Sequence, residues 1–341
     1  MITINGIPLN DAESQGVFWV DIPNIAGSSE NIQIQRGVGT STNGAGAFGA
    51  TVNLQTSALK EDAYATVENT FGSFNTIKNN VQFGTGLLDN NWSFQGSFSR
   101  IQSDGYIDRA SSDLKSYYLS GGYYGENTII KGIMFGGREE TYQAWLGVPE
   151  SKMGEFANGQ NYLGDLAKPL AELFGNEPET TPGDLTFNPY TYKNQIDHYS
   201  QDHYQLHISQ QIGDHVNLSG AAHYTYGRGY YEQYRENASL SLHQIDPVTI
   251  GDSTINKSDL VRRRWLDNHF YGGTFTAQYD NQEDLIVTLG GAWNIYDGTH
   301  YGKLKWARFA GNSEIDNKFY DNDALKHDFN VYTKLDYRIN L

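Results

Sequence analysis

The sequence predicts an all-β protein whose strands form part of an antiparallel transmembrane β-barrel. From about residue 62 onward, apolar and polar residues alternate with period 2, which places each set on one face of a strand. Short and long connections alternate between these strands, as expected when short turns lie at one rim and long loops at the other. The chain is also rich in Tyr and Gly yet polar overall, with 24 Tyr and 37 Gly. A polar lumen and polar loops give a membrane barrel this composition.

Charge and composition exclude several other classes. Lys and Arg number 24 against 40 Asp and Glu, a net charge of −16, and no basic patch exists beyond Arg262, Arg263 and Arg264. A nucleic-acid partner is therefore not expected. The absence of cysteine excludes disulfide scaffolds, thiolate zinc sites and cysteine nucleophiles. No run of 18 apolar residues is present, so a membrane-spanning helix is not expected. The first residues also lack the basic start and apolar run of a signal peptide.

Ten strands are expected, and many exceed the usual length of strands in soluble proteins. One of them shows the alternation clearly: Trp92, Phe94, Gly96 and Phe98 interleave with Ser93, Gln95, Ser97 and Ser99. The ranges are 62–72, 76–88, 91–102, 113–125, 127–138, 198–213, 215–232, 266–280, 284–298 and 326–339.

The lengths of the connections between strands say more about the architecture than the strands themselves. After a first short link near residues 72–75, tight polar turns alternate with longer segments at 103–112, 139–197, 233–265 and 299–325. A structureless loop as long as 139–197 would be unusual, and residues 161–174 are expected to hold a short helix within it. A soluble sandwich, propeller or lectin-like domain also alternates along its strands. Aromatic residues near the strand ends favour an interfacial girdle instead: Trp92, Tyr123, Tyr124, Tyr230, Tyr231 and Tyr296.

Residues 1–57 differ from the rest, with short apolar stretches separated by Gly, Asn and Ser. Residues 44–49 read Gly-Ala-Gly-Ala-Phe-Gly and formally match the dinucleotide-binding fingerprint. That fingerprint requires a hydrophobic strand before it and a helix after it. Here a polar run precedes it and a β-type run follows, so nucleotide binding is not expected. The glycines instead suit a compact, loop-rich module packed inside a larger structure.

This segment resembles the plug domain of TonB-dependent outer-membrane receptors. The resemblance lies in Ile-Gln-Arg-Gly-Val-Gly-Thr-Ser at 34–41, then Gly44, Ala47, Gly49 and Val-Asn-Leu-Gln-Thr at 52–56. Residues 4–11, Ile-Asn-Gly-Ile-Pro-Leu-Asn-Asp, resemble a strand and turn from the middle of the same plug. The family often has Gly-Gly before the final plug strand, where this chain has Gly49 followed by Ala50. The plug-motif positions are Arg36, Gly37, Gly39, Gly44, Gly49 and Asn53.

The resemblance implies a plug enclosed by a barrel of about 22 strands. Residues 1–57 would be the C-terminal half of the plug, and residues 58–341 the first ten strands or so of the barrel. We therefore expect a piece of a longer receptor that does not work alone as a transporter, because unpaired strand edges are not tolerated in lipid.

The function that the resemblance implies is active uptake of a scarce ligand across the bacterial outer membrane, without catalysis and without a cofactor. The partners would be outer-membrane lipid, a periplasmic TonB-type energy-transducing protein and a small-molecule or oligosaccharide ligand. Siderophore, haem, cobalamin and oligosaccharide all stay open as cargo. Two alternatives remain: a complete ten-stranded outer-membrane enzyme such as a surface protease, and a soluble carbohydrate-binding β module.

Candidate binding residues follow from position and chemistry. If the strands on either side of the 213–215 turn pair, position 203 faces 225 and position 205 faces 223. His223 then lies diagonal to both His203 and His207, where the three either contact iron or haem or form part of a polar lumen lining. Tyr142, Trp145, Trp265 and Trp306 fall in the expected long loops, where aromatic rings can stack on sugars or flat chelates. Arg36 is either paired with a barrel carboxylate such as Glu68 or exposed on a turn. No catalytic or metal-ligating set is expected.

Overall fold

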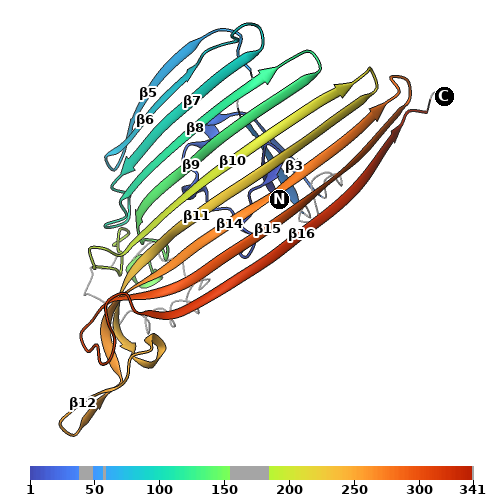
Figure 1. Cartoon of the computed structure of the whole chain (residues 1–341). Coiled ribbons are helices and arrows are strands. Elements are labelled where there is room, and N and C mark those ends of the chain that lie inside the picture. The colour runs from blue at the N-terminus through green and yellow to red at the C-terminus, as the bar shows by residue number, and fades with distance from the viewer. Residues whose placement is uncertain (38–48, 57–58, 154–183, 340–341) are drawn as a thin grey trace.

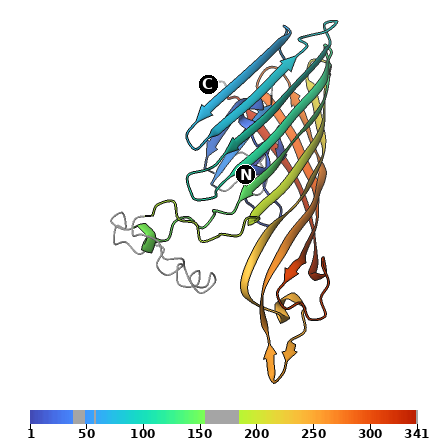
Figure 2. The ribbon, with the colours of Figure 1, turned by 90° about the vertical axis from the view of Figure 1, so that its left-hand side faces the viewer.

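The computed structural model describes residues 1–37, 49–56, 59–153 and 184–339. These residues form a small N-terminal sheet and a large curved one, shown in two views in Figures 1 and 2. The expected helix at 161–174 lies outside the described residues. Within them, no helix is both long and apolar enough to cross a membrane.

The N-terminal module, residues 2–36 and 50–56, is a four-stranded sheet in the order β2-β1-β4-β3. Strands β1 and β4 are parallel and the other two pairs are antiparallel. Two short 3-10 helices connect β2 to β3. The elements are β1 (Ile2–Ile4), β2 (Ile7–Pro8), η1 (Trp19–Asp21), η2 (Ile25–Ser28), β3 (Ser29–Arg36) and β4 (Ala50–Thr56). The run after the dinucleotide-like glycines is therefore a strand, as predicted, and not the helix that nucleotide binding needs.

The second sheet, here called the wall, contains the ten predicted strands, each paired antiparallel with its chain neighbour. It is open, with β5 and β16 at its edges. The strands are β5 (Tyr64–Gly72), β6 (Thr76–Gly84), β7 (Trp92–Ser103), β8 (Ser112–Tyr124), β9 (Thr128–Tyr142), β10 (Ile196–Ile212), β11 (Val216–Ser239), β14 (Lys257–Asp280), β15 (Leu285–Ala307) and β16 (Lys318–Tyr337).

Connections of different length lie at opposite ends of the wall. The short-turn end carries residues 85–91, 125–127, 213–215 and 281–284. The long-loop end carries the short first link, 73–75, and the longer connections, which include 104–111, 143–153 with 184–195, 240–256 and 308–317. These contain α1 (Glu150–Met153), η5 (Ser241–His243) and the hairpin of β12 (Val248–Ile250) and β13 (Ser253–Ile255). Figure 1 shows that hairpin projecting from this end. The predicted sorting of connections by length is confirmed.

Strand lengths differ from the prediction at the long-loop end. About half of each expected loop, 233–265 and 299–325, is extended strand, because β11, β14, β15 and β16 continue past the apolar alternation. These extensions are rich in charged and polar residues, including Arg262, Arg263 and Arg264. The sequence marks the end of the apolar pattern there, but backbone pairing carries the strands further.

The two faces of the wall have inverted polarity. On β7, Phe94 and Phe98 are each 49% exposed, whereas Ser97, on the opposite face between them, is 6% exposed. The same inversion recurs along the sheet, with exposed Leu206 and Ile208 on β10 and buried Gln205 beside them. A sheet of a soluble protein buries its apolar face instead. We call the polar face, against which the N-terminal module packs, the inner face, and the apolar one the outer face.

A small apolar cluster joins the N-terminal module to the inner face. It contains Ile4, Ile22, Ile25 and Leu54 from the module, and Tyr118, Ile133 and Phe135 from the wall. Hydrogen bonds surround this cluster: Asn5 Nδ2 donates to Gln205 Oε1 at 3.0 Å, and the Tyr118 hydroxyl donates to Thr56 Oγ1 at 3.0 Å. The module is thus held mainly by polar contacts around a modest apolar centre.

Candidate ligand site between the N-terminal module and the wall

A cavity of about 300 Å³ lies between residues 8–22 of the N-terminal module and the inner face of β10, β11 and β14. The wall residues that line it, such as Tyr199 and Tyr231, lie toward the long-loop end of their strands. Trp145, from the connection between β9 and β10, also lines it. We call this space the inner cavity.

The module's side of the cavity is a turn shaped by its own polar side chains. Asp11 Oδ1 accepts hydrogen bonds from the backbone N–H groups of Glu13 and Ser14, at 3.1 and 2.6 Å. Asn10 accepts from the Ile2 N–H at 2.7 Å and donates to the Gln15 carbonyl at 2.8 Å. Asn and Asp commonly stabilise turns in this way. Residues 10–16 therefore form a defined turn that projects from β1 and β2 toward the cavity.

Three contacts fasten this turn to the last strands of the wall. The Tyr296 hydroxyl donates to Glu13 Oε2 at 2.7 Å, and His300 Nε2 lies 2.7 Å from the same oxygen. Lys326 Nζ donates to the Ala12 carbonyl at 2.8 Å. The cavity is bounded on this side by contacts between residues almost the whole chain apart.

Close approach of the module to β9 requires a glycine at position 137. A Cβ atom there would clash with the carbonyl oxygen of Asp21 and with Pro23 Cδ. Any larger residue would push η1 away from the wall. Gly137 therefore sets the depth at which η1 lies.

The electrostatics of the cavity are dominated by carboxyl groups. Burial raises the pKa of Asp21 to about 7, and the negative charges of Asp197 and Asp11 add to the increase. Asp11, Asp21 and Asp197 all line the cavity, with Arg264 as a cationic group beside them. Because desolvation disfavours the charged carboxylate, Asp21 binds a proton near neutral pH.

Aromatic side chains are the other main group that lines the inner cavity. Trp145 is 57% exposed and lies edge-on to Tyr231 with ring centroids 6.1 Å apart. Phe18, Tyr199 and Tyr296 also line the cavity. Rings of this kind can stack on sugars or flat chelates while nearby polar groups fix orientation.

The predicted histidine register is confirmed, but the three rings do not line one cavity. His203 pairs with Thr225 and Gln205 with His223, as the turn at 213–215 predicted. The His203 ring stacks on Phe135 at 4.4 Å, and His223 Nε2 contacts Asn294 Oδ1 at 2.9 Å.

Of the three histidines, only His203 lines the inner cavity, while His207 and His223 line other hollows of the wall. No group of three or more His, Asp or Glu among the described residues is placed to hold a metal ion.

The four candidate aromatic residues separate in the structure. Trp145 alone lies in a connection, since Tyr142 ends β9, Trp265 is within β14 and Trp306 is within β15. The prediction that all four stand in loops is wrong for those three, because the strands extend past the apolar pattern. Tyr142 is buried and donates to the Tyr192 carbonyl, and Trp265 stacks on Tyr301 with ring centroids 5.8 Å apart.

The plug-motif residues take mainly structural positions. Arg36 ends β3 and is exposed, and no ion pair joins it to Glu68, which accepts a hydrogen bond from Asn80 instead. Gly37 has φ +83° and its N–H donates to the Gly49 carbonyl at 2.7 Å. Asn53 accepts from the Thr3 hydroxyl at 2.7 Å. Gly39 and Gly44 lie outside the described residues.

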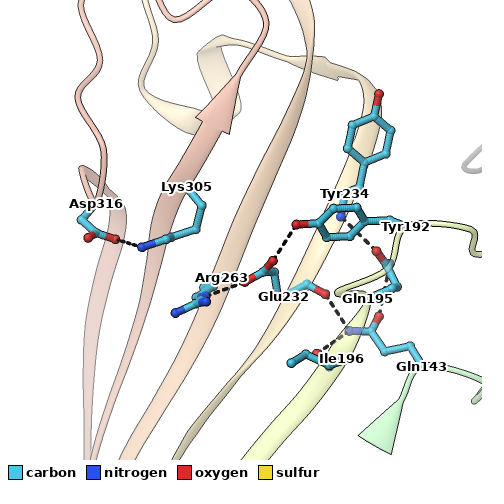
Figure 3. Close-up of polar contacts among 9 residues, drawn as sticks. All are labelled: Gln143, Tyr192, Gln195, Ile196, Glu232, Tyr234, Arg263, Lys305 and Asp316. Carbon is cyan, nitrogen blue, oxygen red and sulfur yellow. Dashed lines mark hydrogen bonds and ion pairs between the residues drawn. The ribbon is translucent and has the colours of Figure 1, made fainter. Parts of the chain in front are cut away.

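A buried polar network that the sequence did not indicate braces the long-loop end (Figure 3). Gln143, fully buried, donates from Nε2 to the carbonyl oxygens of Ile196 and Glu232, each at 3.0 Å. The Glu232 carboxylate accepts from the Tyr192 hydroxyl and from Arg263 Nε, each at 2.7 Å. Burial and this carboxylate raise the pKa of Tyr192 to about 12. The network fixes the start of the connection that carries Trp145.

No protein-family model and no curated protein sequence matches the chain. Solved structures do match it: the copper transporter OprC (12% identity, TM-score 0.65), the ferripyoverdine receptor of the outer membrane of Pseudomonas aeruginosa (11%, 0.60) and the siderophore receptor PiuA from Acinetobacter baumannii (12%, 0.58). They match 98%, 97% and 97% of this chain, which covers 44%, 42% and 47% of theirs. The chain thus spans less than half the length of each. The likeness shows the fold: part of an antiparallel β-barrel with a module on its inner face, as in these structures.

Proposed function

We propose that this chain is part of a TonB-dependent receptor that takes up a scarce small ligand across the bacterial outer membrane. The observation that carries the proposal is the inverted wall: its apolar face is exposed and its polar face is covered by the N-terminal module. Lipid is the environment in which an exposed apolar sheet face is favourable, with polar side chains turned toward the lumen. The likeness to outer-membrane receptors supports the same assignment.

We assign residues 1–57 to the plug and residues 58–341 to the barrel. The contacts between them suit a plug that moves, because most are hydrogen bonds that water can replace. A periplasmic energy-transducing partner would pull on the plug, and no bond in the ligand would be broken. The chain would supply binding, positioning and a removable barrier.

The inner cavity is the proposed ligand site. It lies on the long-loop half of the wall, which would face the cell exterior, and combines exposed Trp145 with carboxyl groups and Arg264. The matching structures include a copper transporter and a receptor bound to ferripyoverdine. The cargo classes considered for this chain stay siderophore, haem, cobalamin and oligosaccharide.

The two other functions fit less well. A complete ten-stranded barrel enzyme would close by pairing its first and last strands, whereas β5 and β16 are both edges of the described sheet. A soluble carbohydrate-binding module would not present Phe94, Phe98 and Leu206 on a continuous exposed face. The matching structures are transporters and receptors.

Ligand binding tests the proposal. The full chain, held in neutral detergent micelles, is dialysed against a ferric siderophore, haem, cobalamin and a maltooligosaccharide in turn. We expect one of these to bind, and Trp145→Ala to weaken it about tenfold, the loss of about 1.4 kcal/mol of stacking. Trp306→Ala is the matched control, because Trp306 is similarly exposed but lies outside the cavity. Absence of binding by all four, or equal loss in both variants, would contradict the assignment of the site.

A further inference from the structure

Three cations stand side by side on the outer face of the wall. In the strand register, Arg100 of β7 lies opposite Lys115 of β8, and Lys115 lies opposite Arg138 of β9. All three are exposed. Arg100 is two residues from the outward Phe98, so it shares the outer face, and residues opposite one another share a face. We call Arg100, Lys115 and Arg138 the cation triplet.

The triplet lies where the apolar surface of β7–β9 ends. The next outer pair toward the short-turn end is Phe98 opposite Tyr117, and Phe94 follows. Between the triplet and the short-turn end, the described wall strands have no Lys or Arg on their outer face. The cations in that part of the wall take inner-face positions in the alternation: Lys131, Lys326 and Lys334. The outward cations are therefore placed at one boundary of the apolar surface.

The charge of the triplet is not balanced within the described residues. Asp113 pairs with Arg100 at 2.8 Å and reaches Lys115 at 3.7 Å. Arg138 makes no hydrogen bond or ion pair with a described residue, and the nearby Glu140 contacts His198 at 3.3 Å. Like charges directly opposite on a sheet are unfavourable. Three adjoining cations therefore share one paired carboxylate in a chain whose net charge is −16.

We propose that the cation triplet binds the phosphate of a lipid headgroup in the leaflet at the long-loop end. The inference rests on the proposed membrane function. Neighbouring strands are about 4.8 Å apart, so the triplet spans about 10 Å, the scale of one or two phosphate groups. Guanidinium groups bind phosphate through paired hydrogen bonds, and the ammonium of Lys115 adds a point charge. Because Phe98 and Tyr117 adjoin the triplet, the ligand carries acyl chains that lie along them.

Lipid retention tests the proposed headgroup site at the cation triplet. The full chain is purified in dodecylmaltoside micelles containing either cardiolipin, a phosphate-bearing lipid, or an uncharged glycosyl diacylglycerol, and bound lipid is counted by native mass spectrometry. We expect cardiolipin retention to fall about tenfold in R100Q/K115Q/R138Q. The control K60Q/K193Q/K257Q changes the charge equally at exposed lysines elsewhere and should retain cardiolipin as the parent does. Arg138→Gln alone should lose about threefold, and its side chain has no described partner whose loss would disturb folding.

The outcomes separate the two proposals. Equal cardiolipin retention in the triplet variant, the control and the parent would overturn the headgroup site. Displacement of cardiolipin by millimolar inorganic phosphate, leaving no lipid bound, would also overturn it, because the site would then recognise free phosphate. Retention of neither lipid by the parent would instead overturn the membrane assignment on which the inference rests.

Discussion

Tyr296 on β15 and Glu13 in the N-terminal module are 283 residues apart in the chain and hydrogen-bonded at 2.7 Å. This bond, together with His300 beside the same carboxylate, joins the turn at residues 10–16 to the far strands of the wall. Local sequence patterns do not indicate this contact. It is nevertheless one of the bonds that any movement of the module out of the wall must break.

Removing the Tyr296 hydroxyl should loosen the module. In Tyr296→Phe, a hydrogen bond to a charged group is lost, which is worth about 1.5–3 kcal/mol. We expect hydrogen exchange of the amides at residues 10–16 to accelerate at least tenfold, while exchange in β7–β9 stays unchanged. Tyr301→Phe is the control, because Tyr301 lies on the same strand and stacks on Trp265 rather than contacting the module. Equal exchange in the two variants would show that this bond does not hold the turn.

A side chain at Gly137 should displace η1. Gly137→Ala places a Cβ against the Asp21 carbonyl and Pro23, and overpacking of this kind costs about 1–3 kcal/mol. We expect faster proteolysis between residues 17 and 25 and a lower unfolding temperature. Gly132→Ala on the same strand is the control, since the nearest atom to its Cβ would be 3.9 Å away. If Gly132→Ala proves as disruptive, the close approach of η1 is not the cause.

The docking of η1 should weaken as pH rises. The pKa of Asp21 is raised from 3.8 to about 7 in the folded chain, so the folded state binds more protons than the unfolded state between those values. The contribution of Asp21 to the stability of the folded chain is most favourable below about pH 4. It declines as pH rises toward 7 and is least favourable above that.

Asp21→Asn should therefore slow hydrogen exchange in residues 17–22 at pH 8 but have little effect at pH 4. Asp252 is exposed in the turn between β12 and β13, and Asp252→Asn should not change hydrogen exchange in residues 17–22 at either pH. An Asp21→Asn effect of the same size at both pH values would mean that proton binding by Asp21 does not control docking.

The network at the long-loop end should depend on Gln143. Gln143→Leu leaves the carbonyl oxygens of Ile196 and Glu232 without their donor, a cost of about 1–3 kcal/mol for each buried group. We expect a lower unfolding temperature and a shifted Trp145 fluorescence maximum, because the connection that begins at residue 143 loses its anchor. Gln211→Leu, at an exposed position, should change neither property. Unaltered fluorescence in Gln143→Leu would separate the network from the position of Trp145.

The sequence predicted the features that depend on alternation along a strand. The ten strands, their order, the sorting of turns and the 203–225 pairing all follow from period 2 and from turn chemistry. The extent of β14 and β15 did not, because backbone pairing continues through charged residues that carry no apolar pattern. The sequence therefore placed Trp265 and Trp306 in loops.

The inner cavity could not be predicted from the sequence either, but for a different reason. It is made by Asp11 and Asp21 on one side and Asp197 on the other, residues whose proximity depends on how two sheets pack. Only Trp145 and His203 of the predicted binding residues line it. A buried Gln143 likewise has no local signal, because its partners lie up to 90 residues away.

The accessibility of side chains along β7 tests most directly whether the outer face of the wall contacts lipid. Because the chain contains no cysteine, single-cysteine spin labels can be introduced without background labelling. Labels at positions 94 and 98 should contact oxygen dissolved in the apolar phase of lipid-containing micelles and avoid a water-soluble nickel chelate. Labels at 95 and 97 should be shielded from both, because the N-terminal module covers that face. Preferential contact of positions 94 and 98 with the water-soluble chelate would contradict a lipid-facing wall, and with it the proposed uptake function.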